Sequence, residues 1–322
     1  MKHFVLGGNG FTGTHLVRAL RRRGDEVVVV VDIDDNGHAQ AAGAVFVNAD
    51  ITDAAALEGV AFGPDDVVHN LAARQYHLPV PRQGQDAYFQ AVNLDGTRVV
   101  LEQMLRQGCR RLVAFSTDMV YGFPEDGPIP PTHRRCPIGP YGRSKMLAEN
   151  LCFAARADGI RVTVFRPRLI VGPGRLGVLV KLFKLIRAGM PVPLIGDGSN
   201  RYQMVSVFDV VDAVLAAVER GVPDGEYNLG SDAPPTVRQL LGRLIASTGS
   251  RSRLVGTPGS LVKAVLAGFE RLGVPLMYRE QYSIADINYL VDIGQTRRDL
   301  GWTPRHGDAD MIAAAYEEFT RR

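Results

Sequence analysis

The chain has 322 residues, of which 46% are hydrophobic and 22% are charged, and its formal net charge is +3. This composition excludes a disordered or disulfide-stapled chain, and the length favours one large α/β domain with a smaller domain appended. A net charge this small does not indicate a nucleic-acid partner, and we expect none.

The cysteine pattern and the hydropathy indicate the cellular setting. Three cysteines occur without a CxxC pair or a neighbouring histidine cluster, at Cys109, Cys136 and Cys152. We therefore expect reduced thiols and no metal site. Met1 leads directly into a strand pattern, which leaves no room for a signal peptide, and Lys181 and Lys184 interrupt the apolar run 178–186. The prediction is a cytoplasmic protein with no membrane span.

Short β-branched apolar runs alternate with helical patterns through the first half of the chain, which is typical of βαβ units. Strands are predicted at residues 3–6, 26–31, 44–47, 66–69, 111–116 and 161–165, and helices at 11–23, 86–107 and 144–158. Runs such as "EVVVVVD" do not alternate with polar residues, so we expect strands that are buried on both faces. These features predict a Rossmann-type α/β fold with a doubly wound parallel sheet.

The alternation breaks down after Arg166, where Gly- and Pro-rich segments separate short helices. We therefore predict a large domain at residues 1–166 and a smaller α/β domain mainly at 167–322. A strand-like stretch, a helix and a further strand occur at about 204–230, and we expect this part of the chain to rejoin the large domain.

Gly7, Gly10 and Gly13 have a GxxGxxG spacing between the first strand and the first helix. In this setting glycines allow a tight turn, close approach of the backbone to a pyrophosphate, and close packing of helix on strand. We expect the dinucleotide also to contact Phe11 and Thr12 at the start of that helix. The spacing is a variant of the GxGxxG fingerprint, so the strand before it and the helix after it carry the prediction.

Asp32 ends the second strand, about twenty residues beyond the loop, where a carboxylate accepts hydrogen bonds from ribose hydroxyls and repels a 2′-phosphate. No arginine stands beside it, so NAD is favoured over NADP. Further candidate cofactor contacts lie at two later strand ends, with Asp50 and Ile51 in "NADITD" and Leu71, Ala72 and Ala73 in "HNLAA". Ordinary turn chemistry also explains these two strand ends.

Tyr141 and Lys145 stand four residues apart in "YGRSK". Residues at this spacing share one face of a helix, so the phenol and the ammonium can converge on one ligand. A free tyrosine has a pKa of about 10, and a nearby ammonium and the positive nicotinamide ring both favour its phenolate. We interpret Tyr141 as the base that removes a proton from a substrate hydroxyl.

The strand-end motif "AFSTDMVYG" supplies a hydroxyl that can orient the substrate oxygen, either Thr117 or, less favoured, Ser116. Tyrosine and lysine four apart occur by chance on many solvated helices. The prediction therefore depends on the order along the chain, in which the glycine loop, Asp32, the strand-end hydroxyl and the tyrosine–lysine pair follow one another.

Over nearly its whole length the chain resembles the extended short-chain dehydrogenases/reductases of the NAD-dependent epimerase/dehydratase family. The similar segments are "GGNGFTG", "NADITD", "HNLAA", "VNLDGT", "STDMVYG", "YGRSK", "FRPRLIVGPGR", "GDGSNRYQMVSVFDVVDA", "YNLG" and "LGWTP". The resemblance implies a catalytic triad of Thr117, Tyr141 and Lys145, tightly bound NAD and a nucleotide-sugar substrate. We include Asn93, Ser116, Tyr141, Lys145 and Arg166 among the cofactor contacts, and we expect a homodimer formed by helices 86–107 and 144–158.

The chain departs from the family pattern at the substrate side. Dehydratases resemble "STDEVYG", whereas Asp118 is followed here by Met119, which disfavours 4,6-dehydration. Leu169 stands where sugar-nucleotide enzymes carry an asparagine, and Tyr202 stands where they carry an arginine, although Arg201 precedes it. We take these five residues as candidate substrate contacts. Other candidates for an anion-binding cation are Arg168, Arg175 and Lys181.

Three functions follow from these patterns. The first is an NAD-dependent epimerase that acts on a nucleotide sugar through a transient keto intermediate, with Tyr141 as base. The second is a net NAD-dependent dehydrogenase of a hydroxylated apolar substrate, because the apolar stretch 261–292 resembles the 3β-hydroxysteroid dehydrogenase-like branch. The third is a non-catalytic NAD-binding scaffold. The spacing of Leu261, Val265 and Leu266 favours an ordinary amphipathic core helix within that apolar stretch.

Overall fold

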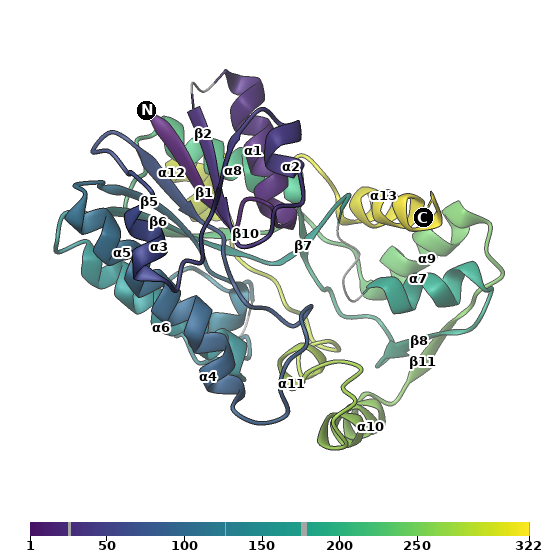
Figure 1. The fold of residues 1–322 in the computed structure, drawn as a ribbon. Helices are drawn as coiled ribbons and strands as arrows, with labels where there is room; N and C mark the ends of the chain where they lie inside the picture. Colours follow the sequence, from purple (N-terminus) through teal and green to yellow (C-terminus); the bar gives the residue numbers. More distant parts are fainter. Residues whose placement is uncertain (25–26, 126, 175–178, 322) are drawn as a thin grey trace.

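The computed structural model describes residues 1–24, 27–125, 127–174 and 179–321, and Figure 1 shows a larger and a smaller lobe. A seven-stranded sheet with the order β10-β6-β5-β4-β1-β2-β3 forms the centre of the larger lobe. Its strands are β1 Lys2–Leu6, β2 Val27–Asp32, β3 Val45–Asn48, β4 Val67–Asn70, β5 Arg111–Phe115, β6 Arg161–Pro167 and β10 Gly225–Leu229, and every pairing is parallel. This confirms the predicted Rossmann-type fold, in which ligands bind where the strand order reverses.

Helices cover both faces of this sheet, which explains why its strands lack polar alternation. The helices are α1 Phe11–Arg23 and α8 Val207–Glu219 on one face, and α5 Thr97–Arg106 and α6 Pro140–Ala155 on the other. Val28 and Val30 of β2 pack into the hydrophobic core that contains α1 and α8. Val29 and Val31 pack into the second core, together with residues of α5 and α6. A polar residue in this strand would therefore be buried on either face.

The predicted helices are partly correct in their bounds. α6 begins at Pro140, before the predicted start at residue 144, because proline is well suited to the first turn of a helix. The predicted helix 86–107 is present as α4 Gln85–Gln90 and α5, joined by a π-helical segment, Ala91–Gly96. Apolar spacing does not reveal such a π-helical segment, which is a wider turn often found at functional sites. Residue 26, the predicted start of the second strand, lies outside the described residues.

The smaller lobe is built mainly from the chain after Pro167. Two short parallel pairs join β7 Leu169–Val171 to β9 Met204–Ser206, and β8 Val192–Ile195 to β11 Leu254–Thr257. Around them lie α7 Leu179–Arg187, α9 Val237–Thr248 and α13 Asp308–Arg321, whose core contains Phe183 and Phe319. The chain returns to the larger lobe between β9 and α9, where α8 packs on α1 and β10 pairs with β6 at the sheet edge.

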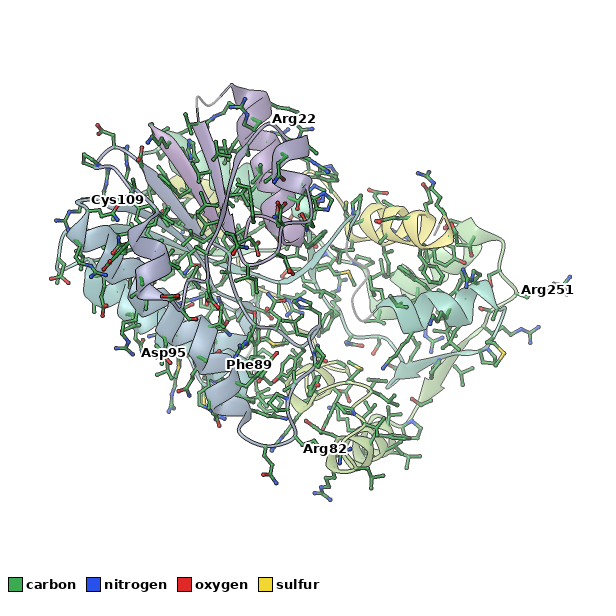
Figure 2. All side chains as sticks on the ribbon, viewed as in Figure 1. Arg22, Arg82, Phe89, Asp95, Cys109 and Arg251 are labelled. Carbon is green, nitrogen blue, oxygen red and sulfur yellow. The ribbon has the colours of Figure 1, made fainter. Side chains whose placement is uncertain are left out.

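The helix α10 Gly259–Arg271 is not the ordinary core helix that its spacing predicts. Leu266 is buried, whereas Leu261 is 60% exposed and Val265 is 49% exposed. The helix packs against α11 Arg279–Tyr282 and β8, and its other side chains project away from both lobes (Figure 2). Its apolar face is therefore largely uncovered. Among the described residues, no helix is both long enough and apolar enough to cross a membrane.

Candidate active site

The glycine loop lies directly against the end of β4. Gly7 has a φ of +76°, and a Cβ placed on it would lie 2.8 Å from the Ala72 Cα atom. A Cβ on Gly13 would overlap the Gly7 carbonyl group. Gly10 precedes α1 as a cap without a side chain, so no side chain at this position caps the first N–H groups of that helix. The loop therefore fits a dinucleotide pyrophosphate at the N-terminus of α1, with Leu71, Ala72 and Ala73 beside it.

The Asp32 carboxylate forms a hydrogen bond with this loop. Its Oδ2 atom accepts a hydrogen bond from the Asn9 backbone N–H at 3.0 Å, and its Oδ1 atom accepts one from the Asp34 N–H at 3.3 Å. Burial raises the pKa of Asp32, and these backbone donors lower it again in part. The carboxylate thus stands at the end of β2 beside the glycine turn, where the ribose of a dinucleotide is expected.

The change Asp32→Asn should weaken NAD binding by about ten- to a hundredfold, because a hydrogen bond to a charged acceptor contributes about 1.5–3 kcal/mol. Titration calorimetry of the NAD-free protein measures this loss. Asp35→Asn is the control, since Asp35 binds the Gly37 N–H and the Gln40 amide of its own turn. Equal losses in both variants, or equal affinity of the parent protein for NAD and NADP, would contradict the assignment.

The other candidate adenine contacts lie at the end of β3. Asp50 is exposed, and its Oδ1 atom accepts hydrogen bonds from the Thr52 N–H and hydroxyl, both at 2.8 Å. Ile51 is 4% exposed and lies against Gly96 of the π-helical segment. Both contacts with the cofactor stay predictions.

The catalytic candidates lie at the end of β5 and in the first two turns of α6. Tyr141 lies in the first turn of α6 and Lys145 one turn later, and both side chains are 7% exposed. Thr117 follows β5, donates a hydrogen bond to Asp118 Oδ1 at 3.2 Å and accepts one from the Met119 N–H at 3.3 Å. Parallel strands β4, β5 and β6 bring these residues to the same edge of the sheet as the glycine loop.

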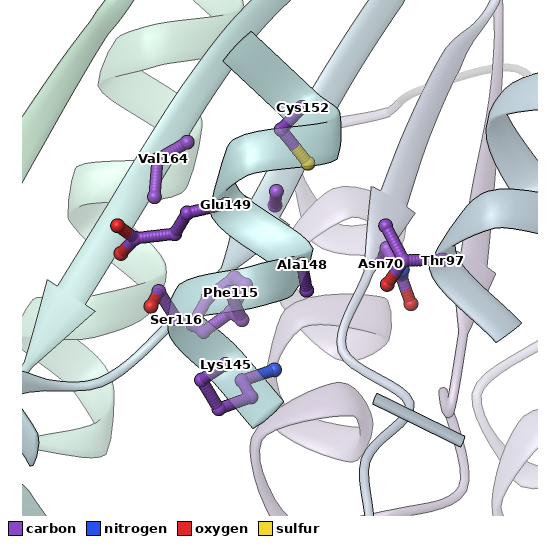
Figure 3. A pocket seen from close by; sticks show the side chains of 10 residues that line it. Asn70, Thr97, Phe115, Ser116, Lys145, Ala148, Glu149, Cys152 and Val164 are labelled. Carbon is purple, nitrogen blue, oxygen red and sulfur yellow. The ribbon is translucent and has the colours of Figure 1, made fainter. Parts of the chain in front are cut away.

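A small pocket lies between α6 and the strands β4, β5 and β6 (Figure 3). Lys145 and Ser116 line it on one side, and Asn70 and Thr97 lie opposite. Among the described residues, Ser116 Oγ and Asn70 Oδ1 are buried here without a hydrogen-bond partner. Unpaired buried polar atoms are costly, so these atoms fit a role in binding a ligand hydroxyl or water beside the Lys145 ammonium.

Burial lowers the pKa of Lys145 to about 8, and the neighbouring Cys152 and Glu149 offset part of this effect. We therefore expect kcat/KM, which reports the free enzyme, to fall as the pH rises through about 8, because the ammonium is lost. Lys145→Arg should move this alkaline limb upward by at least about one pH unit, since a guanidinium stays protonated. A pH-rate profile tests this, with the exposed Lys184→Arg as control. An alkaline limb unchanged by Lys145→Arg would contradict it.

The same lysine has a consequence for stability. The unfolded chain holds the proton up to a pKa of 10.5, whereas the folded chain releases it at about 8. The unfolded state therefore binds more protons between these values, and the contribution of Lys145 to the free energy of unfolding rises with pH across that window.

Asn93 forms hydrogen bonds that link α6 to a neighbouring segment of the larger lobe. It is 1% exposed in the π-helical segment, and its amide donates to Ser144 Oγ at 2.9 Å and accepts from the Arg74 N–H at 2.9 Å. Ser144 Oγ in turn donates to the Tyr141 carbonyl at 2.8 Å. The amide thus links α6 to the chain after β4, and its contact with the cofactor stays a prediction.

Arg166 is also occupied by protein partners. Its Nε and Nη2 atoms donate to the two carboxylate oxygens of Glu149 at 2.8 and 2.7 Å. Its Nη1 atom donates to the Tyr121 hydroxyl at 3.0 Å and to the Pro131 carbonyl at 2.8 Å. With a side chain that is 2% exposed, this arginine joins α6 to β6 inside the lobe, and its contact with the cofactor stays a prediction.

Asp118 forms a buried ion pair with Arg168. The Arg168 guanidinium carbon lies 4.5 Å from the Tyr202 ring centre and 4.3 Å from that of Tyr289. Two predicted substrate contacts, Asp118 and Tyr202, are therefore brought together by an arginine from the end of β6. Leu169 begins β7 and is half-buried next to that arginine in sequence.

The other candidates for an anion-binding cation are Arg201, Lys181 and Arg175. Arg201 is exposed, and its Nη1 atom donates to the Pro234 carbonyl at 3.0 Å. Lys181 is exposed on α7 and donates to the Leu276 carbonyl at 3.0 Å. Arg175 lies outside the described residues. The structure thus does not bring Arg201 or Lys181 into hydrogen bonds with the Asp118 cluster.

The sequence model of the NAD dependent epimerase/dehydratase family matches residues 3–230. The chain belongs to this family. It is 31% identical to the UDP-glucose 4-epimerase of Streptococcus mutans over 98% of this chain and 95% of that protein. It is 30% identical to the dTDP-glucose 4,6-dehydratase of Streptomyces antibioticus over 97% of this chain and 90% of that protein. The crystal structure of the Streptomyces venezuelae dTDP-glucose 4,6-dehydratase with NAD and TYD bound is similar at a TM-score of 0.80 and 25% identity, covering 100% and 98% of the two chains.

As a member of the epimerase/dehydratase family, the protein is an NAD-dependent enzyme, and the glycine loop with Asp32 fits that cofactor. Within this enzyme the structure adds residues that the sequence pattern did not single out. Tyr289 packs on Arg168, and Glu280 contacts the first turn of α6. Both residues come from the segment 278–291, so no spacing within the motifs could have revealed their contacts.

Proposed function

We propose that this family member is an epimerase that acts on a nucleotide sugar through a transient keto form of the substrate. The observation that carries the proposal is the position of Tyr141 and Lys145 one turn apart at the start of α6, a helix that packs against residues 118–120, directly after Thr117 at the end of β5. The relatives named above act on dTDP-glucose or UDP-glucose, which supports the substrate class.

Each residue has a task in the reaction. The Tyr141 phenolate takes the proton of a sugar hydroxyl, and the Thr117 hydroxyl holds the same oxygen as charge develops on it. The Lys145 ammonium stabilises the phenolate by its charge. The glycine loop and Asp32 would hold NAD, which would supply a hydride acceptor for the sugar carbon and a hydride donor to the opposite face of the ketone. The product is then a stereoisomer of the substrate.

The residues at the predicted substrate-binding positions favour epimerisation over loss of water. Dehydration needs an acid beside the leaving hydroxyl, and Met119 cannot supply one. The Asp118 carboxylate accepts hydrogen bonds from Arg168 and Thr117, so it is already engaged by protein donors. This engagement supports a structural role for Asp118 and leaves no acid–base pair at the positions where the dehydratases of the family carry one.

The test uses the purified protein with the NAD that it retains and no added cofactor. UDP- and dTDP-hexoses are supplied singly, and products are separated by chromatography and analysed by NMR. We expect interconversion of two sugar stereoisomers without accumulation of NADH. Loss of water from the product would indicate a dehydratase, and stoichiometric NADH release would indicate a net dehydrogenase.

A net dehydrogenase of an apolar alcohol is the second candidate, because the uncovered apolar face of α10 and Leu169 both fit such a substrate. Steady growth of NADH absorbance with a steroid or long-chain alcohol would support it. Bound NAD with no turnover of either substrate class would instead support a non-catalytic scaffold.

A further inference from the structure

The carboxylate of Glu280, which is distant from α6 in the sequence, caps the N-terminus of that helix. Glu280 lies on the short helix α11 and is 3% exposed. Its Oε1 atom accepts a hydrogen bond from the Tyr141 backbone N–H at 2.9 Å, and its Oε2 atom accepts one from the Gly142 N–H at 3.1 Å. These donors belong to the second and third residues of α6, which a capping side chain ordinarily satisfies.

The local sequence cannot supply that cap. The residue before α6 is Gly139, which has no side chain, and the helix continues with Pro140. A Cβ on Gly139 would overlap the Glu280 carboxyl group, so the glycine makes the space that the distant carboxylate fills. A negative charge at this position is also favourable, because the helix dipole is positive at its N-terminus.

Glu280 fixes an aromatic neighbour of Tyr141 as well. The Tyr76 hydroxyl donates to Glu280 Oε1 at 2.6 Å. The Tyr76 ring stacks on Tyr278 with centres 4.2 Å apart, and lies edge-on to the Tyr141 ring at 5.8 Å. Phe89 packs against the Tyr141 ring at 5.7 Å. The Tyr141 side chain is therefore held by its backbone, by the Tyr76 ring, which Glu280 fixes, and by the Phe89 ring.

We propose that Glu280 is a positioning residue, which holds the first turn of α6 and the Tyr76 ring so that the Tyr141 phenol is aimed at the substrate. The inference rests on the proposed function of Tyr141 as the base. Glu280 does not contact the reacting atoms, because both its oxygens are occupied by these donors. Its loss should therefore lower kcat and leave the substrate KM nearly unchanged.

Two variants disturb this cap, one by changing Glu280 itself and the other by changing the glycine beside it. Glu280→Gln removes the charge and one acceptor, and Gly139→Ala displaces an intact Glu280. The matched control is Glu270→Gln, because Glu270 accepts from the Tyr282 hydroxyl at 3.1 Å and from the Arg279 N–H but makes no hydrogen bond to α6. Kinetic constants are expressed per NAD-loaded protein, so that partial unfolding does not imitate a catalytic loss.

The first readout is hydrogen exchange at the Tyr141 and Gly142 amides, which needs no catalysis. We expect exchange at least about tenfold faster in both variants and unchanged in the control. The second readout is turnover, where kcat should fall about ten- to a hundredfold with KM within about twofold, since small misplacement of a reacting group has effects of this size.

Unchanged exchange in both variants would overturn the proposal. Faster exchange with unchanged kcat would also overturn it, because Glu280 would then be only a structural cap. Failure of the proposed function would be visible separately, as absence of sugar-nucleotide turnover in the parent enzyme. The same kinetic comparison would then be made with the alcohol that the parent oxidises, and an unchanged kcat there would equally overturn the proposal.

Discussion

Tyr141→Phe should lower kcat about a thousandfold, because proton transfer by a positioned side chain contributes about 10²–10⁴ to the rate. The ring stays, so its packing against Tyr76 and Phe89 is retained and the fold is undisturbed. NAD should still bind, since the glycine loop and Asp32 are intact. Turnover of the sugar nucleotide, with the NAD content measured in the same sample, tests this expectation.

The matched control is Tyr316→Phe, which removes a phenol hydroxyl from α13 in the core of the smaller lobe. Tyr316 is 8% exposed, close to the 7% of Tyr141, so the two variants change similarly buried residues. We expect wild-type turnover from the control. Turnover of Tyr141→Phe within a few fold of the parent, with NAD still bound, would show that another group is the base.

Arg166→Met should reduce the free energy of unfolding by about 1.5–3 kcal/mol, because the buried Glu149 carboxylate loses its two hydrogen bonds from Arg166 and keeps only the one from Arg135 at 2.9 Å. Glu149 is 2% exposed, and the two side chains share two hydrogen bonds. Urea denaturation measures the change. Arg143→Met is the control, since its pair with Asp86 joins side chains that are 45% and 55% exposed, and such pairs contribute at most about 1 kcal/mol.

NAD affinity separates the two roles considered for Arg166. If Arg166 only holds α6 against β6, the folded Arg166→Met protein keeps every direct contact with NAD. Its affinity for NAD should then lie within about threefold of that of the parent protein. A stable variant with much weaker NAD binding would instead support the direct cofactor contact predicted from the sequence.

The large lobe could be predicted because its signals are local. Uninterrupted valines in β2 report burial on two faces, and the glycines between β1 and α1 report a turn with no room for side chains. The family, which the resemblance of the motifs implied, and its NAD cofactor are confirmed. The roles of the catalytic triad stay predictions, although Tyr141 and Lys145 do lie one turn apart on α6.

Long-range side-chain pairing could not be predicted. Glu280 meets the Tyr141 N–H across 139 positions of the chain, and Arg168 meets Asp118 across 50. A single sequence carries no periodicity that links such positions. The exposure of α10 was missed for a related reason, because spacing defines an apolar face and does not say which element covers it.

The return of the chain to the larger lobe limits how this protein can be divided. A fragment ending near Pro167 would lack β10, and β6 would then present a row of unpaired backbone groups along a Val- and Phe-containing strand. Bare edges of this kind recruit other strands and promote aggregation. The dinucleotide-binding half is thus not an independent module that can be excised at a single cut, and chimeras with other enzymes need three junctions, one near Pro167 and one on each side of the segment that ends with β10.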